Sequence, residues 1–327
     1  MESSATTRSP QNRTLPGLLI TIFLAYASLG TAAEPCVLEG NTAAVDALAF
    51  SADGQRLVSG SDDGQVRIWD VAAGKERQRW KAHENRVSSL TMAPDGATFL
   101  TVSRDATAKV WELATGKERL ALRGHTERIY RGEYTPDGKG IVTAGRDGIR
   151  FWNLATGQPE GMIEPVDDEQ YSFLDLHPQG TQLATSSRSG GILLWSLPQK
   201  KMSGQLPGHV DRTYCLRYFA RGKMLVSGGV DERVRVWDVA TAKEAKELAG
   251  HTGRVLCLAV LQDPSLAASG SEDHSVRLWD LRTGAAGSVL RGHTAPVQAV
   301  AFSPDGKLLA SGGKDQTIRV WKLGGSH

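Results

Sequence analysis

The chain has 327 residues, of which 40% are hydrophobic and 23% are charged, the composition of a globular protein with one large domain or two ordinary ones. Its 38 lysines and arginines against 36 acidic residues lack the basic excess typical of a nucleic-acid binder. Three cysteines are too few for a disulfide framework. We therefore expect no nucleic-acid partner and no disulfide-dependent fold.

The N-terminal segment differs in kind from the rest of the chain. Residues 1–14 are polar and include Arg8 and Arg13, an apolar run follows at 18–29, and small residues lead up to Ala33. This order is typical of a secretory signal peptide, and the run is short of the about 20 residues of a membrane span. We expect residues 1–33 to be a signal peptide and the protein to be exported, to the periplasm or the extracellular space. An uncleaved anchor is the alternative, and only then would a membrane be a partner.

A repeat occupies the remainder of the chain. Seven of the eight tryptophans recur at intervals of 41 to 43 residues: Trp69, Trp111, Trp152, Trp195, Trp237, Trp279 and Trp321. A hydroxyl side chain precedes each tryptophan by ten residues, or by nine in the third unit: Ser59, Thr101, Thr143, Thr185, Ser227, Ser269 and Ser311. An aspartate stands four residues after this hydroxyl in six units: Asp63, Asp105, Asp147, Asp231, Asp273 and Asp315. A histidine stands eighteen residues before the hydroxyl residue in five units: His83, His125, His209, His251 and His293.

Each unit is predicted to form four short strands. In the second unit they fall at 87–92, 98–102, 107–112 and 118–122, where residues alternate between apolar and polar and turn residues separate the runs. A four-stranded unit that recurs every 42 residues or so is typical of a propeller blade. The sequence therefore predicts an all-β protein, a seven-bladed β-propeller with four-stranded antiparallel blades.

The repeat resembles the WD-repeat family over residues 34–327. The resemblance is carried by Gly-His near the start of a unit, as at Gly250-His251, and Trp-Asp near its end, as at Trp279-Asp280. It implies a ring of blades around a channel, with the first strand of each blade innermost. The blades are expected near residues 39–80, 81–122, 123–163, 164–205, 206–248, 249–290 and 291–327. Too few residues follow Trp321 for a fourth strand, so we expect residues 34–38 to complete the last blade and close the ring.

The recurring histidine, aspartate and hydroxyl side chains could suggest a hydrolytic triad. An active site is assembled once, whereas this set occurs in several copies, so the resemblance favours a structural hydrogen-bond network in each blade. The residues expected in it include His83, Thr101, Asp105, Trp111, His251, Ser269, Asp273, Trp279, His293, Ser311, Asp315 and Trp321. We expect no catalytic residue, no metal site and no cofactor. Cys215 and Cys257 occupy the same position in adjacent units, where a small buried residue is expected and a disulfide is the alternative.

The differences between units point to a binding site. In four units an arginine follows the histidine by three residues. In three units an arginine stands just before the position of the repeated aspartate, which is a serine in blade four. In two units a tyrosine follows the histidine by five residues. The resemblance places all these positions at one rim of the channel, and the candidate partner-binding residues are Arg86, Arg104, Arg128, Tyr130, Arg146, Arg188, Arg212, Tyr214 and Arg254. Arginine and tyrosine are favoured at binding hot spots. We expect a non-catalytic scaffold that binds an acidic protein or peptide at this rim.

Other functions remain open from sequence alone. A propeller enzyme or enzyme subunit acting on a small molecule in the channel is the first alternative, although Arg131, Glu133, Asp175 and Arg217 look like mutually compensated charges there. A polysaccharide binder is the second. Blade four is expected to be the weakest, because Asp167 and Ser189 replace the histidine and aspartate of the network.

Overall fold

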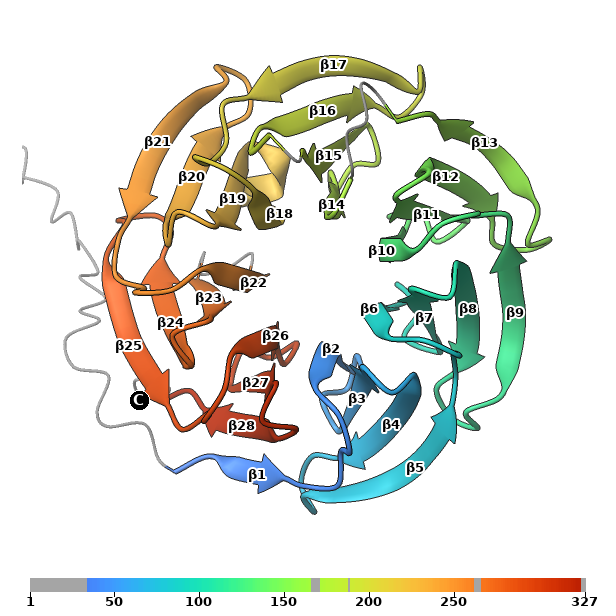
Figure 1. Ribbon diagram of the computed structural model, residues 1–327, viewed down its shortest axis with the longest axis vertical. Helices are drawn as coiled ribbons and strands as arrows, with labels where there is room; N and C mark the ends of the chain where they lie inside the picture. The colour runs from blue at the N-terminus through green and yellow to red at the C-terminus, as the bar shows by residue number, and fades with distance from the viewer. Residues whose placement is uncertain (1–33, 166–170, 188, 262–265, 325–327) are drawn as a thin grey trace, which may run out of the picture.

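The computed structural model describes residues 34–165, 171–187, 189–261 and 266–324. These residues form 28 β-strands in seven four-stranded antiparallel sheets, which surround a central axis as the blades of a propeller (Figure 1). The predicted fold is thereby confirmed. The expected signal peptide, Asp167 and Arg188 lie outside the described residues. None of the helices in the described part of the chain has the length and apolar character needed to cross a membrane.

The strands of each blade follow one another from the channel outwards (Figure 1). Blades one and two comprise β2 (Val45–Phe50), β3 (Arg56–Ser61), β4 (Gln65–Asp70) and β5 (Lys75–Lys81), then β6 (Val87–Met92), β7 (Thr98–Ser103), β8 (Thr107–Glu112) and β9 (Glu118–Arg123). Blades three and four comprise β10 (Ile129–Tyr134), β11 (Gly140–Gly145), β12 (Gly148–Asn153) and β13 (Pro159–Ile163), then β14 (Leu174–Leu176), β15 (Gln182–Ser186), β16 (Ile192–Ser196) and β17 (Lys201–Leu206).

The remaining blades repeat this order. Blades five and six comprise β18 (Thr213–Phe219), β19 (Met224–Gly229), β20 (Val234–Asp238) and β21 (Lys243–Leu248), then β22 (Val255–Leu261), β23 (Leu266–Ser271), β24 (Ser275–Asp280) and β25 (Ala286–Arg291). Blade seven comprises β26 (Val297–Phe302), β27 (Leu308–Gly313), β28 (Ile318–Lys322) and β1 (Cys36–Leu38). A single 3-10 turn among the described residues, η1 (Ala220–Gly222), joins β18 to β19.

The N-terminal strand closes the ring, as the sequence predicts. Strand β1 pairs antiparallel with β28, with Cys36 opposite Val320 and Leu38 opposite Ile318. Leu38 is fully buried and joins a hydrophobic cluster that includes residues of blades seven and one. Closure therefore combines backbone pairing within blade seven with apolar burial against blade one.

Neighbouring blades pack through small residues. Val45 of β2 lies against Gly312 of β27, where an added Cβ would come within 2.6 Å of a valine methyl carbon. The same close approach recurs between Gly270 and Val297 of the next blade. Cys215 and Cys257 lie in equivalent positions of β18 and β22, and both are buried free thiols. Any larger side chain at these glycines would push adjacent blades apart.

A β-bulge shapes the channel end of the innermost strand in six blades. In blade one, Val45 pairs with Ser61 and Ala47 pairs with Gly60, so Asp46 is the extra residue without a ladder partner. Equivalent bulges occur in β6, β10, β18, β22 and β26. A bulge redirects a side chain and ends regular pairing. The repeat thus offers one unpaired residue per bulged blade at one end of the channel.

Candidate functional site

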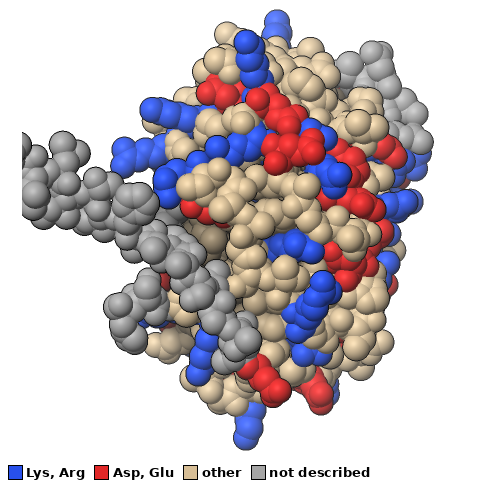
Figure 2. All heavy atoms as spheres, turned by 90° about the vertical axis from the view of Figure 1, so that its left-hand side faces the viewer, with Lys and Arg blue, Asp and Glu red and all other residues tan. Residues whose placement is uncertain are grey.

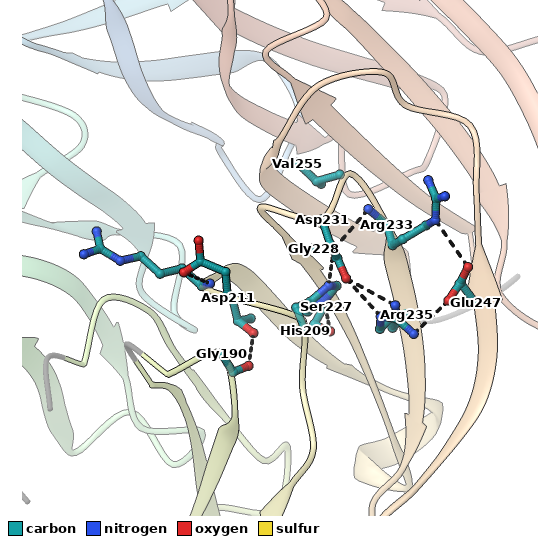
Figure 3. Close-up of polar contacts among 12 residues, drawn as sticks. Gly190, His209, Asp211, Ser227, Gly228, Asp231, Arg233, Arg235, Glu247 and Val255 are labelled. Atoms are coloured by element: carbon teal, nitrogen blue, oxygen red, sulfur yellow. Dashed lines mark hydrogen bonds and ion pairs between the residues drawn. The ribbon is translucent and has the colours of Figure 1, made fainter.

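The histidine, hydroxyl and tryptophan side chains form a buried hydrogen-bond chain in five blades. In blade two, the Trp111 indole donates to Thr101 Oγ1 at 2.8 Å, and Thr101 lies 2.7 Å from His83 Nε2. The ionised Asp105 carboxylate can only accept, so His83 Nδ1 carries the ring hydrogen and donates it across 3.1 Å, which leaves Nε2 to accept from the Thr101 hydroxyl. Figure 3 shows the blade-five copy, in which His209 lies between Ser227 and Asp231.

The electrostatics of these sets fit neutral histidine and ionised aspartate. Burial lowers the pKa of His251 and His293, although their aspartate partners act in the opposite sense. Burial alone would raise the pKa of Asp273, but hydrogen bonds from Ser275 and His251 lower it to about 2. Each hydroxyl already accepts from an indole and is fully buried, so it offers no nucleophile to a substrate. These sets hold the blades in shape.

Blades one and four depart from this network. Asn41 stands where other blades have histidine, and its buried side-chain amide has no hydrogen-bond partner. The tryptophan-to-hydroxyl bond persists without histidine, at 2.9 Å from Trp69 to Ser59 and 2.8 Å from Trp195 to Thr185. In blade four the buried Tyr171 packs edge-on against Trp195, with ring centroids 5.5 Å apart.

A row of cations that the sequence reasoning missed lies beside the network. Arg235 ion-pairs with the network aspartate Asp231 at 3.2 Å, and Arg277 and Arg319 occupy the same position in the next blades. A Cβ on Gly250 would come within 2.9 Å of the Arg277 guanidinium. The glycine of the Gly-His pair therefore leaves room for this cation. A cation two residues before six of the seven tryptophans was the available signal.

One end of the channel opens into a cavity of about 550 Å³. All seven blades contribute the residue five positions after the histidine position, and six of these are bulge residues. We call this set the mouth ring: Asp46, Ser88, Tyr130, Ser172, Tyr214, Leu256 and Gln298. The bulge thus turns a repeat position into a ring of side chains that differ from blade to blade.

Most of the arginines singled out from the sequence also line this cavity. Those that line it are Arg86, Arg104, Arg128 and Arg212, together with Tyr130 and Tyr214. Arg146 and Arg254 are exposed nearby but do not line it, and Arg188 lies outside the described residues. The two arginine rows are adjacent because the Arg104 amide donates to the Arg86 carbonyl and the Arg146 amide donates to the Arg128 carbonyl, both at 3.1 Å.

Two of the predicted arginines already have acidic partners. Arg86 reaches across the blade boundary to ion-pair with Asp46, and its Nε lies 3.8 Å from Asp62. Arg254 pairs with Glu272 at 3.7 Å. These two are less free to bind a partner than the sequence suggested. Asp46 was missed, although its place five residues after Asn41 matches that of Tyr130 and Tyr214.

Asp46 is an unusual member of the mouth ring. Its side chain is 1% exposed, and its Oδ2 atom is buried without a hydrogen-bond partner. Burial raises its pKa to about 7 in spite of the Arg86 charge. The carboxyl is thus poised to change charge near neutral pH.

The cavity as a whole carries an excess of positive charge. Its lining has seven cationic and two acidic side chains: Arg86, Arg104, Arg128, Arg131, Arg212, Arg217 and Lys314 against Asp46 and Glu272. Among the described residues, Arg104, Arg128, Arg212 and Lys314 have no ion-pair partner. Burial and then the charges of Arg86 and Arg128 lower the pKa of Arg104, so these cations lie close enough to repel one another.

Deeper in the channel, the charges compensate one another. The guanidinium groups of Arg131 and Arg217 lie over the Phe173 ring at 4.6 and 4.8 Å. Arg131 pairs with Glu133 at 3.1 Å and Arg217 pairs with Asp175 at 3.2 Å. Both arginines also line a second cavity of about 490 Å³ toward the opposite end. Among the described residues, no three His, Cys, Asp or Glu side chains are grouped to hold a metal.

The outer wall of the ring contrasts with the mouth. On the side of β21 and β25, basic and acidic side chains lie next to one another (Figure 2). On blade five, Arg235 pairs with Glu244 at 2.7 Å. Arg235 also pairs with Glu247 at 2.8 Å, and Arg233 reaches the same glutamate (Figure 3). Unpaired positive charge therefore distinguishes the mouth from this part of the wall.

Comparison with known proteins gives local matches to repeat proteins. The chain is 46% identical over 59 residues to vegetative incompatibility protein HET-E-1 of Podospora anserina, covering 18% of this chain and 4% of that protein. It is 41% identical over 51 residues to ASTRA-associated protein 1 of Aspergillus niger, covering 16% and 12%. It is 32% identical over 87 residues to transcription factor unc-37 of Caenorhabditis elegans, covering 27% and 14%. The chain thus spans a small part of each of these relatives.

The family described as WD domain, G-beta repeat matches residues 34–70, 74–112, 200–238, 242–280 and 285–322. The second segment runs from the outermost strand of blade one, β5, through β6, β7 and β8 of blade two. The sequence repeat is thus offset by one strand from the blade, which is why β1 is needed to close the ring. These matches cover more than half of the chain, and the protein belongs to the WD-repeat family.

Proposed function

We propose that the protein is a non-catalytic scaffold that binds an acidic segment of a protein partner at the channel mouth. The observation that carries this proposal is that four cationic side chains line the mouth cavity without an ion-pair partner among the described residues: Arg104, Arg128, Arg212 and Lys314. Like charges held together on a rigid ring repel one another, and an anionic ligand relieves that repulsion.

The composition of the mouth fits macromolecular recognition. Tyr130 and Tyr214 lie half-buried among the arginines, and both residue types are favoured at binding hot spots. The buried network leaves the ring little freedom to adjust, so a partner would meet a preformed surface. A catalytic function would need an acid–base pair or a nucleophile in the channel, and Arg131, Glu133, Asp175 and Arg217 are engaged with one another instead.

The test is a triple charge reversal, Arg104→Glu with Arg128→Glu and Arg212→Glu. These three line the cavity without an ion-pair partner among the described residues, whereas reversing Arg86 would also leave the buried Asp46 unpaired. Partners are recovered by affinity capture on the unchanged protein, and the affinity of each is then measured across a range of salt concentrations. We expect affinity to fall with added salt and to drop by at least about a hundredfold in the triple variant.

The matched control reverses three cations on outermost strands, Arg119→Glu with Arg123→Glu and Arg291→Glu. All three are exposed on β9 or β25, so the net charge changes equally away from the mouth. Unchanged binding by the mouth variant, or an equal loss in both variants, would overturn the proposal.

We also propose that this scaffold works outside the cytoplasm. Support comes from the basic, apolar and small-residue order of residues 1–33, which ends just before the strand that closes the ring. N-terminal sequencing of exported protein should begin at or within a few residues of Glu34. Recovery of the full-length chain from the cytoplasm would contradict this localisation.

A further inference from the structure

We infer that the mouth selects acidic segments that also carry a large aliphatic side chain, and that Leu256 is the residue that recognises it. This inference rests on the proposed function and adds to it a chemical specificity. It follows from the division of the mouth cavity into two walls of different chemistry, which the charge count alone does not reveal.

One wall of the cavity is cationic and aromatic. Blade two contributes Arg86 and Arg104, blade three contributes Arg128 and Tyr130, and blade five contributes Arg212 and Tyr214. Blade four, between them, contributes Ser172 and Phe173. This wall spans the innermost strands β6, β10, β14 and β18 (Figure 1).

The other wall carries fewer cations and presents one accessible aliphatic side chain. It is formed by blades six, seven and one, which contribute Asp46, Glu272, Gln298 and Lys314. Its apolar lining residues, all buried except Leu256, are Leu256, Cys257, Leu258, Ala299, Val300, Ala47 and Leu48. Of these, Leu256 alone belongs to the mouth ring, as the bulge residue of β22, and it is partly exposed. In the other bulged blades this place holds Asp46, Ser88, Tyr130, Tyr214 or Gln298, none of them aliphatic. Strand β22 faces β6 and β10 across the channel (Figure 1).

The two walls together define the ligand. Carboxylates on a segment crossing the mouth would meet the guanidinium groups of blades two and three, and a side chain pointing the opposite way would meet Leu256. Packed against Leu256 itself, a charged or polar side chain would lose hydration and gain no hydrogen bond. An aliphatic side chain would remove both its own surface and that of Leu256 from water. A cavity of about 550 Å³ accommodates a short segment of chain.

The experiment uses synthetic peptides with an acidic cluster flanked by one test position that holds leucine or serine. Affinities are measured by fluorescence anisotropy at low salt for the unchanged protein and for Leu256→Ser. We expect the leucine peptide to bind the unchanged protein about tenfold more tightly than the serine peptide, the low end for burying one leucine side chain. In Leu256→Ser this ratio should fall to about one, while both peptides still bind through their acidic residues.

Two further variants exclude trivial explanations. Leu256→Met keeps an apolar side chain and should keep the preference for the leucine peptide, which a misfolded mouth would not do. Val289→Ser changes a residue that is 37% exposed on β25 and should leave the ratio unchanged.

The outcomes separate this inference from the proposed function. Peptides that bind with a ratio near one, or a ratio that Leu256→Ser does not alter, would overturn the inference and leave acidic recognition standing. Failure of every acidic peptide to bind the unchanged protein, or binding that Arg128→Glu does not weaken, would count against the proposed function itself.

Discussion

Changing Thr101 to valine tests whether the histidine adds stability to the buried network. Thr101 is fully buried and its hydroxyl lies between two polar groups, His83 Nε2 at 2.7 Å and Trp111 Nε1 at 2.8 Å. Valine keeps the shape of threonine and leaves both groups without a partner. Blade four offers the matched control, because Thr185 is equally buried and, among the described residues, its hydroxyl bonds to Trp195 alone, at 2.8 Å.

The expected losses follow from the number of groups left unsatisfied. Each buried polar group without a partner costs about 1–3 kcal/mol, so Thr101→Val should lower the free energy of unfolding by about twice as much as Thr185→Val. Urea denaturation followed by tryptophan fluorescence measures both, with an unchanged m-value as the check that the comparison is valid. Thr143→Val, in the second intact copy, should match Thr101→Val. Equal losses in blades two and four would refute the reasoning, since the histidine bond would then add nothing.

Three further predictions concern charge, closure and the weakest blade. The pKa of Asp46 is raised from 3.8 to about 7, so the folded state holds a proton that the unfolded state releases, and stability falls as pH rises from about 4 to 7. Asp46→Asn should therefore raise the melting temperature above that of the unchanged protein by more at pH 8 than at pH 5. The control Asp62→Asn, at an exposed residue, should show no such pH dependence. A gain from Asp46→Asn that is the same at both pH values would contradict this. Deleting residues 34–38 removes β1 and exposes the edge of β28, which should lower the melting temperature and promote association, and an unchanged monomeric protein would contradict the closure. Hydrogen exchange should be faster in β14–β17 than in blades five and six, because β14 has three residues and the blade lacks the histidine bond; uniform protection would count against it.

The sequence predicted the parts of this molecule that every blade repeats. The spacing of tryptophans and hydroxyls located the strands, and the missing last strand predicted the role of β1. Contacts that cross from one blade to the next were not predictable, since they depend on how far adjacent blades are rotated. The pair of Arg86 with Asp46 and the stacking of Arg131 and Arg217 on Phe173 are of this kind. The bulges were also invisible, because the residue that leaves the ladder has no fixed type.

The freedom of the bulge position to hold different residue types explains where specificity can arise in a ring of similar blades. Residues on either side of the bulge pair in the ladder and pack against the next blade, as Val255 does against Gly228, so their size is constrained. The bulge residue itself has no ladder partner and points into the channel mouth. It can become aspartate, tyrosine or leucine in different blades without disturbing the pairing around it. A ligand that binds the mouth ring therefore contacts the positions at which the blades differ. Substitutions at these positions alter recognition, while the buried networks keep the ring intact.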